Sequence, residues 1–425
     1  MRTQQALTVQ TGLRLLLVAV GTLLAGPTIA ATMQLVIDDA PGEGFNDPTP
    51  VSPVGGNQGT TLGAQRRVAL QYAADILGSR IDSAVPIRIA ARFDNLGCTR
   101  NSATLGQAAP ATYTANFGAS AARADVYYPV ALANALRGRR VAGVDNDIQA
   151  TFNTALDAGD NDCLRGRRWY YGLDGAQPGA ASRFVSTAVH ELTHGLGFVS
   201  LVRLQDSASA RVGQFPAAAS NGRRLPDIFS SFIQDLSFDG QPLWPDLTDE
   251  QRAASLTNDP YVVWSAANTN SQAMTVLSDG FSQGRLQLYA PAVMRPGSSI
   301  SHWDTRLTPD QIMEPFATDE DEVTAGIGLS ACVLEDIGWS LINGTRCPDI
   351  DAPAIAGAPA DTTREPASVN GVDAQIDADT AVSSGDDSTS SGGGCTLVGG
   401  QRADPLWLAM LVLAALSIGY RRRRG

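Results

Sequence analysis

The sequence predicts one mixed α+β domain over residues 31–347, with a targeting segment at each end of the chain. Two stretches, 62–77 and 182–195, repeat apolar residues at helical spacing, and 85–93 alternates apolar and polar residues as a strand does. Apolar residues make up 44% of the chain and charged residues only 17%, which suffices for a sizeable buried core.

Residues 1–30 predict a secretory signal peptide. Arg2 and Arg14 precede an apolar run, 15–25, and residues 28–30 form a small-residue cleavage site. The alternative is a membrane anchor, for which the apolar run is short. Removal of this peptide implies export to an oxidising compartment, where disulfides persist.

The folded part is expected to interleave helices and strands. Met33–Ile37 predicts an edge strand, Leu62–Leu77 a helix and Val85–Phe93 a strand. Further helices are predicted at Tyr128–Leu136 and Ser182–Gly195. These elements make up one half of the domain, and the chain from residue 200 onwards supplies the other half.

The C-terminal quarter divides into a linker and a tail. Residues 348–394 carry nine acidic residues, one Arg and no aromatic residue, which predicts a disordered acidic linker. The Ser- and Gly-rich run 390–395 leads into the tail, 395–425, which has an apolar stretch at 405–420 and the cluster Arg421–Arg424. It resembles the bacterial C-terminal sorting signals, and a plain membrane anchor is the alternative. Either way, the tail predicts contact with a membrane.

Charge and cysteine content exclude several functions. All 31 basic residues are Arg, so chemistry that needs a catalytic Lys is excluded. Residues 31–394 hold 24 Arg against 42 acidic residues, a net of −18, and so acidic a body argues against a nucleic-acid partner. No CxxC spacing occurs, which argues against a structural zinc knuckle. Apart from Cys395, four cysteines allow three pairings, of which we favour Cys98–Cys163 and Cys332–Cys347, because the second closes a short loop.

The segment that carries chemistry is HELTHGLGF at residues 190–198. His190 and His194 are four residues apart, so a helix presents both imidazoles on one face to a single metal ion. Glu191 is placed to take a proton from a zinc-bound water and pass it to the leaving amine. Composition alone would produce an HExxH pattern in roughly 4 of 10,000 such chains, so an incidental match is a weak alternative.

A zinc hydrolase needs a third protein ligand. A compact metzincin would supply a histidine at position 200, which is Ser200 here. The chain has one further histidine, His302, and Glu250 is the only glutamate between the motif and that residue. Glu250 lies in what looks like a solvated helix start capped by Thr248. We therefore assign the third ligand to His302, with Glu250 or an unrecognised Asp as alternatives.

Several segments together resemble the leishmanolysin family of metzincin-like zinc metallopeptidases, over about residues 33–340. They are HELTHGLGF at 190–198, PGSSISHWD at 296–304, QIMEP at 311–315 and LEDIGW at 334–339, with GEGFND at 42–47, GGN at 55–57 and LYAP at 288–291 matching bacterial secreted relatives. The resemblance implies a zincin or metzincin-like catalytic domain with a long insertion between the HExxH helix and the third zinc ligand. It also implies that His190, His194 and His302 bind zinc, that Glu191 is the base and that Met313 lies in a turn beneath the metal. The length of the insertion leaves substrate preference open, and no cysteine precedes Cys98 to control latency.

Some residues keep two interpretations. Asp304 is either a carboxylate that orients a ligand histidine or an ordinary turn acid. Acidic residues in 157–162 and 319–322 are weak calcium candidates without EF-hand spacing, and solvated loops are the simpler interpretation. Tyr289 is the one candidate for an oxyanion stabiliser. We expect the tryptophans 264, 303 and 339 in the core.

These observations favour an exported, monomeric zinc endopeptidase that acts on proteins or peptides and is tethered to the cell surface or released. One alternative is a catalytically idle zinc-containing surface adhesin, which has no need of Glu191. Another is a metallohydrolase that acts on non-peptide amides.

Overall fold

The computed structural model describes residues 29–158, 162–176, 178–179, 181–207, 210–218, 222–317, 326–342, 345 and 347–350, and two strands at 381–383 and 396–398. These residues form seven α-helices and several small sheets, so the expected α+β class is confirmed. The expected signal-peptide run, 15–25, and the apolar stretch 405–420 lie outside them. Among the described helices, none has both the length and the apolar character needed to cross a bilayer.

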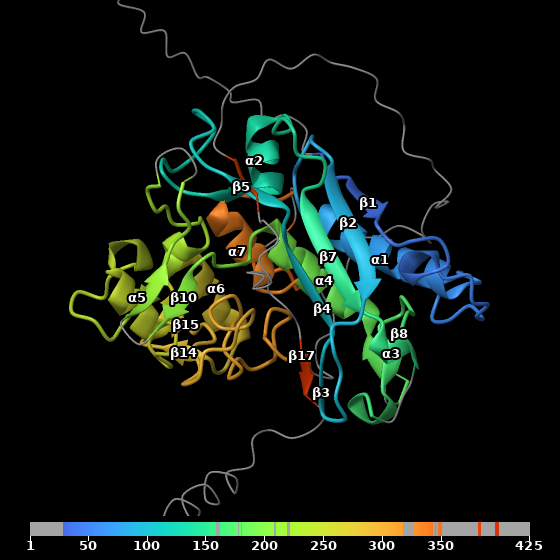
Figure 1. Cartoon of the computed structure of the whole chain (residues 1–425). Coiled ribbons are helices and arrows are strands. Elements are labelled where there is room, and N and C mark those ends of the chain that lie inside the picture. Colours follow the sequence, from blue (N-terminus) through green and yellow to red (C-terminus); the bar gives the residue numbers. More distant parts are fainter. Residues whose placement is uncertain are drawn as a thin grey trace, which may run out of the picture.

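The main sheet has four strands in the order β1–β2–β7–β4 (Figure 1). They are β1 (Met33–Ile37), β2 (Ile87–Asp94), β7 (Ile148–Asn153) and β4 (Gly106–Pro110). The first three are parallel, whereas β4 runs antiparallel to β7 and forms an edge of the sheet. The strand expected at 33–37 is therefore confirmed, as is its place at the opposite edge.

Two helices, α1 (Leu62–Gly78) and α4 (Phe184–Leu196), pack on the sheet and on each other. Thr61 caps α1 by accepting a hydrogen bond from the Ala64 N–H. Gly195 brings α4 close to the sheet, since a Cβ there would lie 2.4 Å from a methyl carbon of Ile148. This close approach fixes the depth at which α4 lies beneath β7 and β4.

An aromatic cluster fixes the start of α4. The ring of Phe184 stacks on Phe93 at 5.7 Å and lies 4.8 Å from Phe152 and 5.4 Å from Trp169. Buried aromatic pairs of this kind contribute about 0.5–1.5 kcal/mol each beyond their burial. Because both the start and the end of α4 are held against the sheet, the rotation of the helix about its axis is set.

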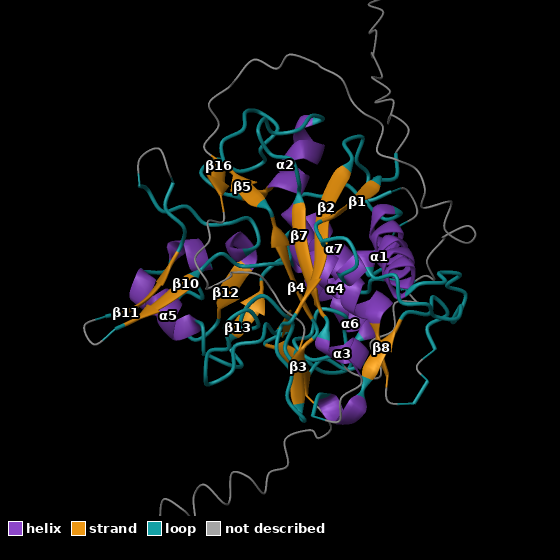
Figure 2. Cartoon of the chain, turned by 45° about the vertical axis from the view of Figure 1, so that its right-hand side comes forward, coloured by secondary structure: helices purple, strands orange, loops and turns teal. Residues whose placement is uncertain are grey.

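The chain from residue 29 to 198, which we call the first half, contains further short elements around this layer (Figure 2). They are β3 (Ser102–Thr104), β5 (Thr112–Thr114), β6 (Tyr128–Pro129), α2 (Val130–Arg137), α3 (Ala155–Ala158), β8 (Arg168–Tyr170) and β9 (Ala181–Arg183). The helix expected at 128–136 thus begins two residues later, after a two-residue strand.

Residues 199–350, the second half, are built mostly from turns and short paired strands. Its elements are β10 (Arg203–Asp206), β11 (Arg211–Gln214), β12 (Ile233–Asp235), α5 (Asp249–Ser255), β13 (Val262–Trp264), α6 (Ala267–Val276), β14 (Phe281–Ser282), β15 (Arg285–Leu286) and α7 (Ser330–Ile337). The three expected core tryptophans are buried. One of them, Trp339, donates a hydrogen bond to the Leu196 carbonyl, so the segment after α7 closes against the end of α4.

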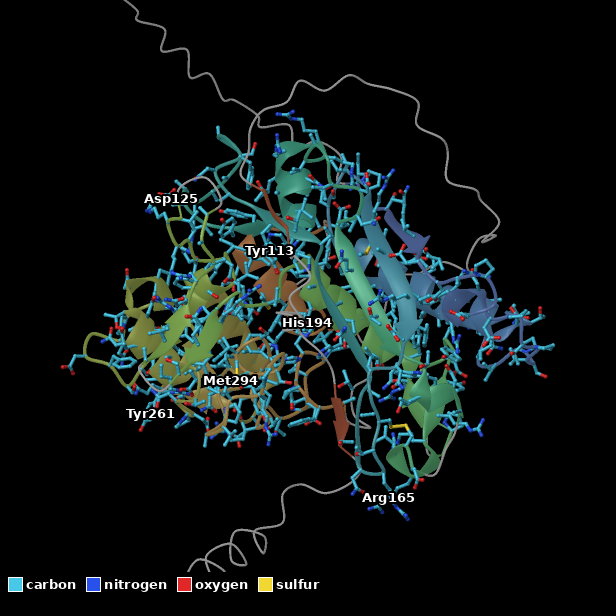
Figure 3. All side chains as sticks on the ribbon, in the orientation of Figure 1. Tyr113, Asp125, Arg165, His194, Tyr261 and Met294 are labelled. Atoms are coloured by element: carbon cyan, nitrogen blue, oxygen red, sulfur yellow. A yellow bond between two sulfur atoms is a disulfide. The ribbon has the colours of Figure 1, made fainter. Side chains whose placement is uncertain are left out.

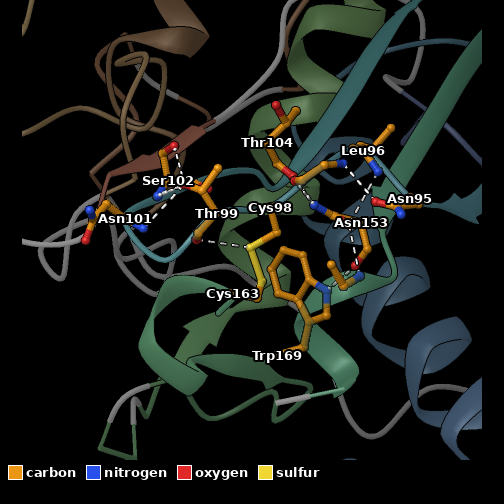
Figure 4. Close-up of a disulfide and its surroundings, with 12 residues drawn as sticks. Asn95, Leu96, Cys98, Thr99, Asn101, Ser102, Thr104, Asn153, Cys163 and Trp169 are labelled. Carbon is orange, nitrogen blue, oxygen red and sulfur yellow. Dashed lines mark hydrogen bonds between the residues drawn. A yellow bond between two sulfur atoms is a disulfide. The ribbon is translucent and has the colours of Figure 1, made fainter. Parts of the chain in front are cut away.

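Both favoured disulfides form. Cys98–Cys163 joins the loop after β2 to the loop before β8 (Figure 4). Cys332–Cys347 joins α7 to the end of the domain. Beside the first bridge, the Asn153 amide donates to the carbonyls of Gly97 and Thr104 and holds this corner of the sheet in place.

The chain beyond residue 347 also contributes to the described fold. Asp349 is buried and accepts a hydrogen bond from Arg80, so the domain continues past the boundary expected at 347. Two short strands follow, β16 (Ala381–Ser383) within the expected linker and β17 (Thr396–Val398) within the expected tail. They pair antiparallel with β5 and β3 respectively.

Candidate metal centre

Helix α4 presents two of the three histidines of the chain. His190 and His194 lie one turn apart on a helix that is buried along its whole length. The helix ends at Gly197, which has a φ of 122° and donates its N–H to the His194 carbonyl. A side chain would be strained in this conformation, and a Cβ there would lie 2.7 Å from Pro129, so the glycine is required at this point.

The third histidine, His302, lies on an irregular segment of the second half. Its carbonyl accepts a hydrogen bond from the Tyr289 N–H, and the Tyr289 carbonyl accepts one from Ile300. The next residue, Trp303, is fully buried and donates its backbone N–H to the Met313 carbonyl. Backbone pairing on both sides, rather than a helix or long strand, thus fixes the position of His302.

The imidazole Nε2 atoms of the three histidines form a nearly equilateral triangle. The separations are 3.1 Å between His190 and His194, and 3.2 Å from each of these to His302. Three nitrogens bound to one tetrahedral zinc ion at about 2.05 Å lie about 3.3 Å apart. The spacing therefore fits one such ion, and among the described residues this is the group with metal-ligand potential. His194 lies in the middle of the molecule, between the two halves (Figure 3).

Each imidazole is oriented by a backbone carbonyl at its other nitrogen. The Nδ1 atoms of His190, His194 and His302 face the carbonyl oxygens of Ile312, Phe198 and Ser298, the last two at 2.7 and 2.8 Å. A carbonyl oxygen only accepts, so each Nδ1 carries the proton and each Nε2 keeps its lone pair. This is the tautomer that a metal ligand requires.

Burial also keeps the three rings neutral. It lowers the pKa of His190 to about 4, although the hydrogen bond to Ile312 acts in the opposite direction. The pKa values of His194 and His302 lie well below the ordinary value, because burial and the neighbouring imidazoles both disfavour a positive charge. A neutral imidazole is the form that binds a metal.

Glu191 is fully buried and lies beneath the edge strand β4. A Cβ built on Gly106 would be 2.9 Å from the Glu191 Cγ and 3.0 Å from its Oε1. Gly106 therefore makes room for the carboxylate, and this close approach places Glu191 directly beside the edge of the sheet.

A turn around Met313 closes the site from the other side. Ile312 binds His190 through its carbonyl, and the buried Met313 binds the backbone of Trp303. This short turn thus links a ligand on α4 to the residue next to the ligand from the second half. The resemblance predicts a methionine turn beneath the metal, and Met313 lies next to a residue that orients a ligand.

A hydrogen-bonded network of buried hydroxyl groups lies within the second half, next to His302. The Ser200 N–H donates to the Ser301 hydroxyl at 3.1 Å, and the hydroxyl groups of Ser200 and Ser230 lie 2.8 Å apart. Asp227 accepts from the Ser230 hydroxyl and from the Leu201 N–H. From the sequence, Ser200 stands out only because a histidine is absent at that position. The short polar run at 298–301, next to His302, was the available signal for this network.

The other candidate residues have other roles in the structure. Glu250 is exposed in the first turn of α5, behind a capping box formed by Thr248, and it is not part of the histidine group. The Asp304 carboxylate accepts from the backbone and side chain of Arg306, which matches the ordinary turn acid. Tyr289 is half-buried against Phe316, and burial raises the pKa of its hydroxyl.

The calcium candidates receive no support. The Asp157 carboxylate accepts hydrogen bonds from Arg66 and Tyr171, so it serves a buried ion pair. The neighbouring 159–161 and the second acidic segment, 319–322, lie outside the described residues.

Comparisons with known proteins found no match for this chain. No family model matches the chain, and searches of curated proteins and of solved structures find no similar protein.

Proposed function

We propose that the protein is a zinc-dependent endopeptidase with a metzincin-like catalytic domain. The observation that carries this proposal is the triangle of three neutral, oriented imidazoles, with a glutamate one residue after the first ligand. A structural zinc site is usually closed by four protein ligands, whereas a catalytic one keeps three and an open position. Three ligands with an adjacent base therefore favour catalysis over a purely structural site.

Each residue of the site would have its own role in the proposed hydrolysis. His190, His194 and His302 would hold the ion, and the carbonyls at their Nδ1 atoms keep the rings aimed at it. A bound zinc ion supplies Lewis acidity and lowers the pKa of water at the site. Glu191 would take the proton from the attacking water and deliver it to the leaving amine. Burial beside Gly106 holds its carboxylate in place during this transfer.

The edge strand supports a peptide as the substrate class. β4 is paired with β7 on one side, and its first residue, Gly106, lies against Glu191. An extended peptide can bind such an edge by strand addition, which positions a peptide bond by main-chain hydrogen bonds. A small non-peptide amide would leave this edge unused, so this alternative is less favoured.

We further propose that the enzyme is exported and held at the cell surface or released. The motifs at residues 1–30 and 395–425 support this, and so do two disulfides, which persist in oxidising compartments. The partners would then be extracellular proteins or peptides, with membrane contact through the tail.

The proposal is tested by a casein digest together with a metal analysis of the full chain. We expect about one zinc per chain, loss of digestion with a chelator and recovery when zinc is restored. A chain that holds zinc but cuts neither casein nor a peptide library would favour the adhesin. Cleavage of small amides without cleavage of any peptide would favour the non-peptide amidase.

A further inference from the structure

Residues 29–31 lie beside the C-terminal end of α1. Ile29 and Ala30 are exposed, whereas Ala31 is buried, so the chain enters the fold at the point where the sequence predicts cleavage of the signal peptide. The Ala31 N–H faces two carbonyls at or just after the end of α1, that of Gly78 at 3.0 Å and that of Ile81 at 2.9 Å. Cleavage after residue 30 would therefore leave the new terminal amine at a place that already binds this nitrogen.

The surroundings of this nitrogen suit a positive charge. The end of a helix carries a partial negative charge from its unpaired carbonyls, and the last turn of α1 contains no basic residue. Arg80 follows the helix, but its side chain binds Asp349. Asp82 is paired opposite Ala30, and its carboxylate accepts a hydrogen bond from the Ile29 N–H at 2.9 Å. Removal of the signal peptide takes this donor away and leaves the carboxylate within one residue of the new amine.

An ammonium group matches these acceptors better than the amide of an uncut chain does. An amide has one hydrogen to share between the carbonyls of Gly78 and Ile81, whereas an ammonium group has three donors. Two of these donors can serve the carbonyls, and the third can face the carboxylate of Asp82. The site therefore distinguishes the cut chain from the uncut one.

Gly78 allows the start of the chain to come this close to the helix. A Cβ built on Gly78 would lie 2.5 Å from the Ala31 carbonyl oxygen, which is too close for any side chain. One residue further on, the Thr32 carbonyl accepts a hydrogen bond from the Ile87 N–H of β2, and β1 begins at Met33. The candidate amine site is thus continuous with an edge strand of the main sheet.

The same corner also holds the end of the domain. The Asp82 N–H donates to the Ser340 carbonyl, at 2.8 Å. The Ile342 N–H donates to the Arg80 carbonyl, at 2.9 Å. The segment held in this way follows α7 and closes against the end of α4 through Trp339. An amine bound here would therefore stabilise a corner that supports the metal-binding helix.

We propose that the end of α1 is a binding site for the ammonium group of the mature N-terminus, so that removal of the signal peptide also completes the fold. Hydrolysis of the Ala30–Ala31 bond by a signal peptidase consumes one water and leaves a carboxylate on Ala30 and an ammonium group on Ala31. The ammonium group then binds the carbonyls of Gly78 and Ile81, with Asp82 as its counter-charge. This inference rests on the export part of the proposed function and does not depend on peptidase activity.

The absence of lysine makes the amine easy to follow. All 31 basic residues are Arg, so the chain has one primary amine, at its N-terminus. An amine-reactive ester labels that group, and mass spectrometry identifies the terminal residue and follows the rate of labelling. The protein is produced from the full-length gene with export.

Two variants test the site. In the first, Gly-Ser is inserted after Ala30, which moves the amine two residues away from the carbonyls. In the second, Asp82→Asn removes the counter-charge. The matched control is Asp239→Asn, which changes an exposed acidic residue in a turn of the second half.

We expect the mature protein to begin at Ala31. Its amine should be labelled at least about tenfold more slowly than that of the folded insertion variant, as hydrogen bonds to a charged group imply. The insertion should also lower the midpoint of chemical denaturation, and Asp82→Asn should change both quantities in the same direction by less. Asp239→Asn should behave as the wild type.

Equal labelling of the folded wild type and the folded insertion variant would overturn the site while leaving export intact. If the insertion prevents folding, the comparison of Asp82→Asn with Asp239→Asn decides, and equal labelling of these two would overturn the site. Slow labelling without a change in the denaturation midpoint would overturn the contribution to folding. A chain that keeps residues 1–30 would contradict export itself, and a terminus at any other residue would overturn the proposal alone.

Discussion

The two halves of the molecule supply the three histidines of the candidate metal centre in different ways. The first half places His190 and His194 on one helix, where spacing in the sequence alone puts both imidazoles on one face. The second half places His302 on an irregular segment, 108 residues after His194, and only contacts with distant residues bring it there. A metal site can thus combine ligands set by local spacing with a ligand set entirely by tertiary structure.

The packing of the halves follows the same division. In the first half, α4 is held against the sheet by the aromatic cluster at its start and by the close approach of Gly195 to Ile148. In the second half, buried tryptophans and short backbone pairings hold the segments in position. Trp303, next to the third ligand, packs on Phe198 from the first half at 5.1 Å. The contact between the halves is therefore part of what completes the site.

The largest effect is expected from removal of the ligand in the second half. His302→Ala should reduce zinc content from about one per chain to near zero and lower peptide hydrolysis at least about 1,000-fold, because two ligands remain for an ion that needs three. Metal analysis after dialysis, with a peptide assay, measures both. Glu250→Ala is the matched control and should retain zinc and activity. Full zinc occupancy in His302→Ala would show that another side chain completes the site.

The two disulfides are expected to stabilise the two halves by different amounts. Cys98 and Cys163 are 65 residues apart in the first half, whereas Cys332 and Cys347 are 15 apart in the second. In the chain-entropy model, loops of these lengths give about 4 and about 3 kcal/mol of stabilisation. Replacing each pair with alanines should therefore destabilise the first more than the second in chemical denaturation.

Wild-type protein treated with a reductant should be destabilised at least as much as either variant, since both bridges are then open. An equal or reversed order of the two variants would mean that loop length does not dominate. Four free thiols per unreduced, unfolded domain of the wild type would mean that the bridges do not form.

The smallest effect is expected at a hydroxyl group of the second half, next to His302. Ser301→Ala removes the acceptor of the buried Ser200 N–H, at a cost of about 1–3 kcal/mol. Because Ser301 precedes His302, we also expect zinc affinity to fall about tenfold, toward the lower end of effects for groups that orient ligands. A zinc-competition titration measures this. The exposed Ser271→Ala is the control, and unchanged zinc affinity in Ser301→Ala would show that the network acts on stability alone.

Much of the first half could be predicted from the sequence. The helices at 62–77 and 182–195 and the strand at 33–37 are confirmed with small shifts at their ends, because their apolar spacing is local information. The order of the sheet could not be predicted, since strand pairing depends on contacts between distant residues. The edge strand β4, with small residues in GQAAP, carries little strand signal, so its position beside Glu191 was missed.

In the second half, the sequence predicted a residue but not its surroundings. His302 was singled out by elimination, since the chain has only three histidines. The carbonyl of Ser298 that orients it and the Ser200–Ser301 hydrogen bond depend on turn geometry, which residue types alone do not specify. The pairing of 381–383 with β5 and of 396–398 with β3 was likewise outside what composition predicts, because backbone groups, not side chains, form it.

The central claim is that Glu191 performs the chemistry while the three histidines hold the metal. It is tested most directly by the rate at which zinc-loaded Glu191→Gln hydrolyses a fluorogenic peptide, relative to the wild type at equal zinc content. We predict a loss of about 1,000-fold, within the range that a positioned proton acceptor supplies, because glutamine keeps the shape of the side chain and cannot accept the proton. A rate within tenfold of the wild type would contradict the account.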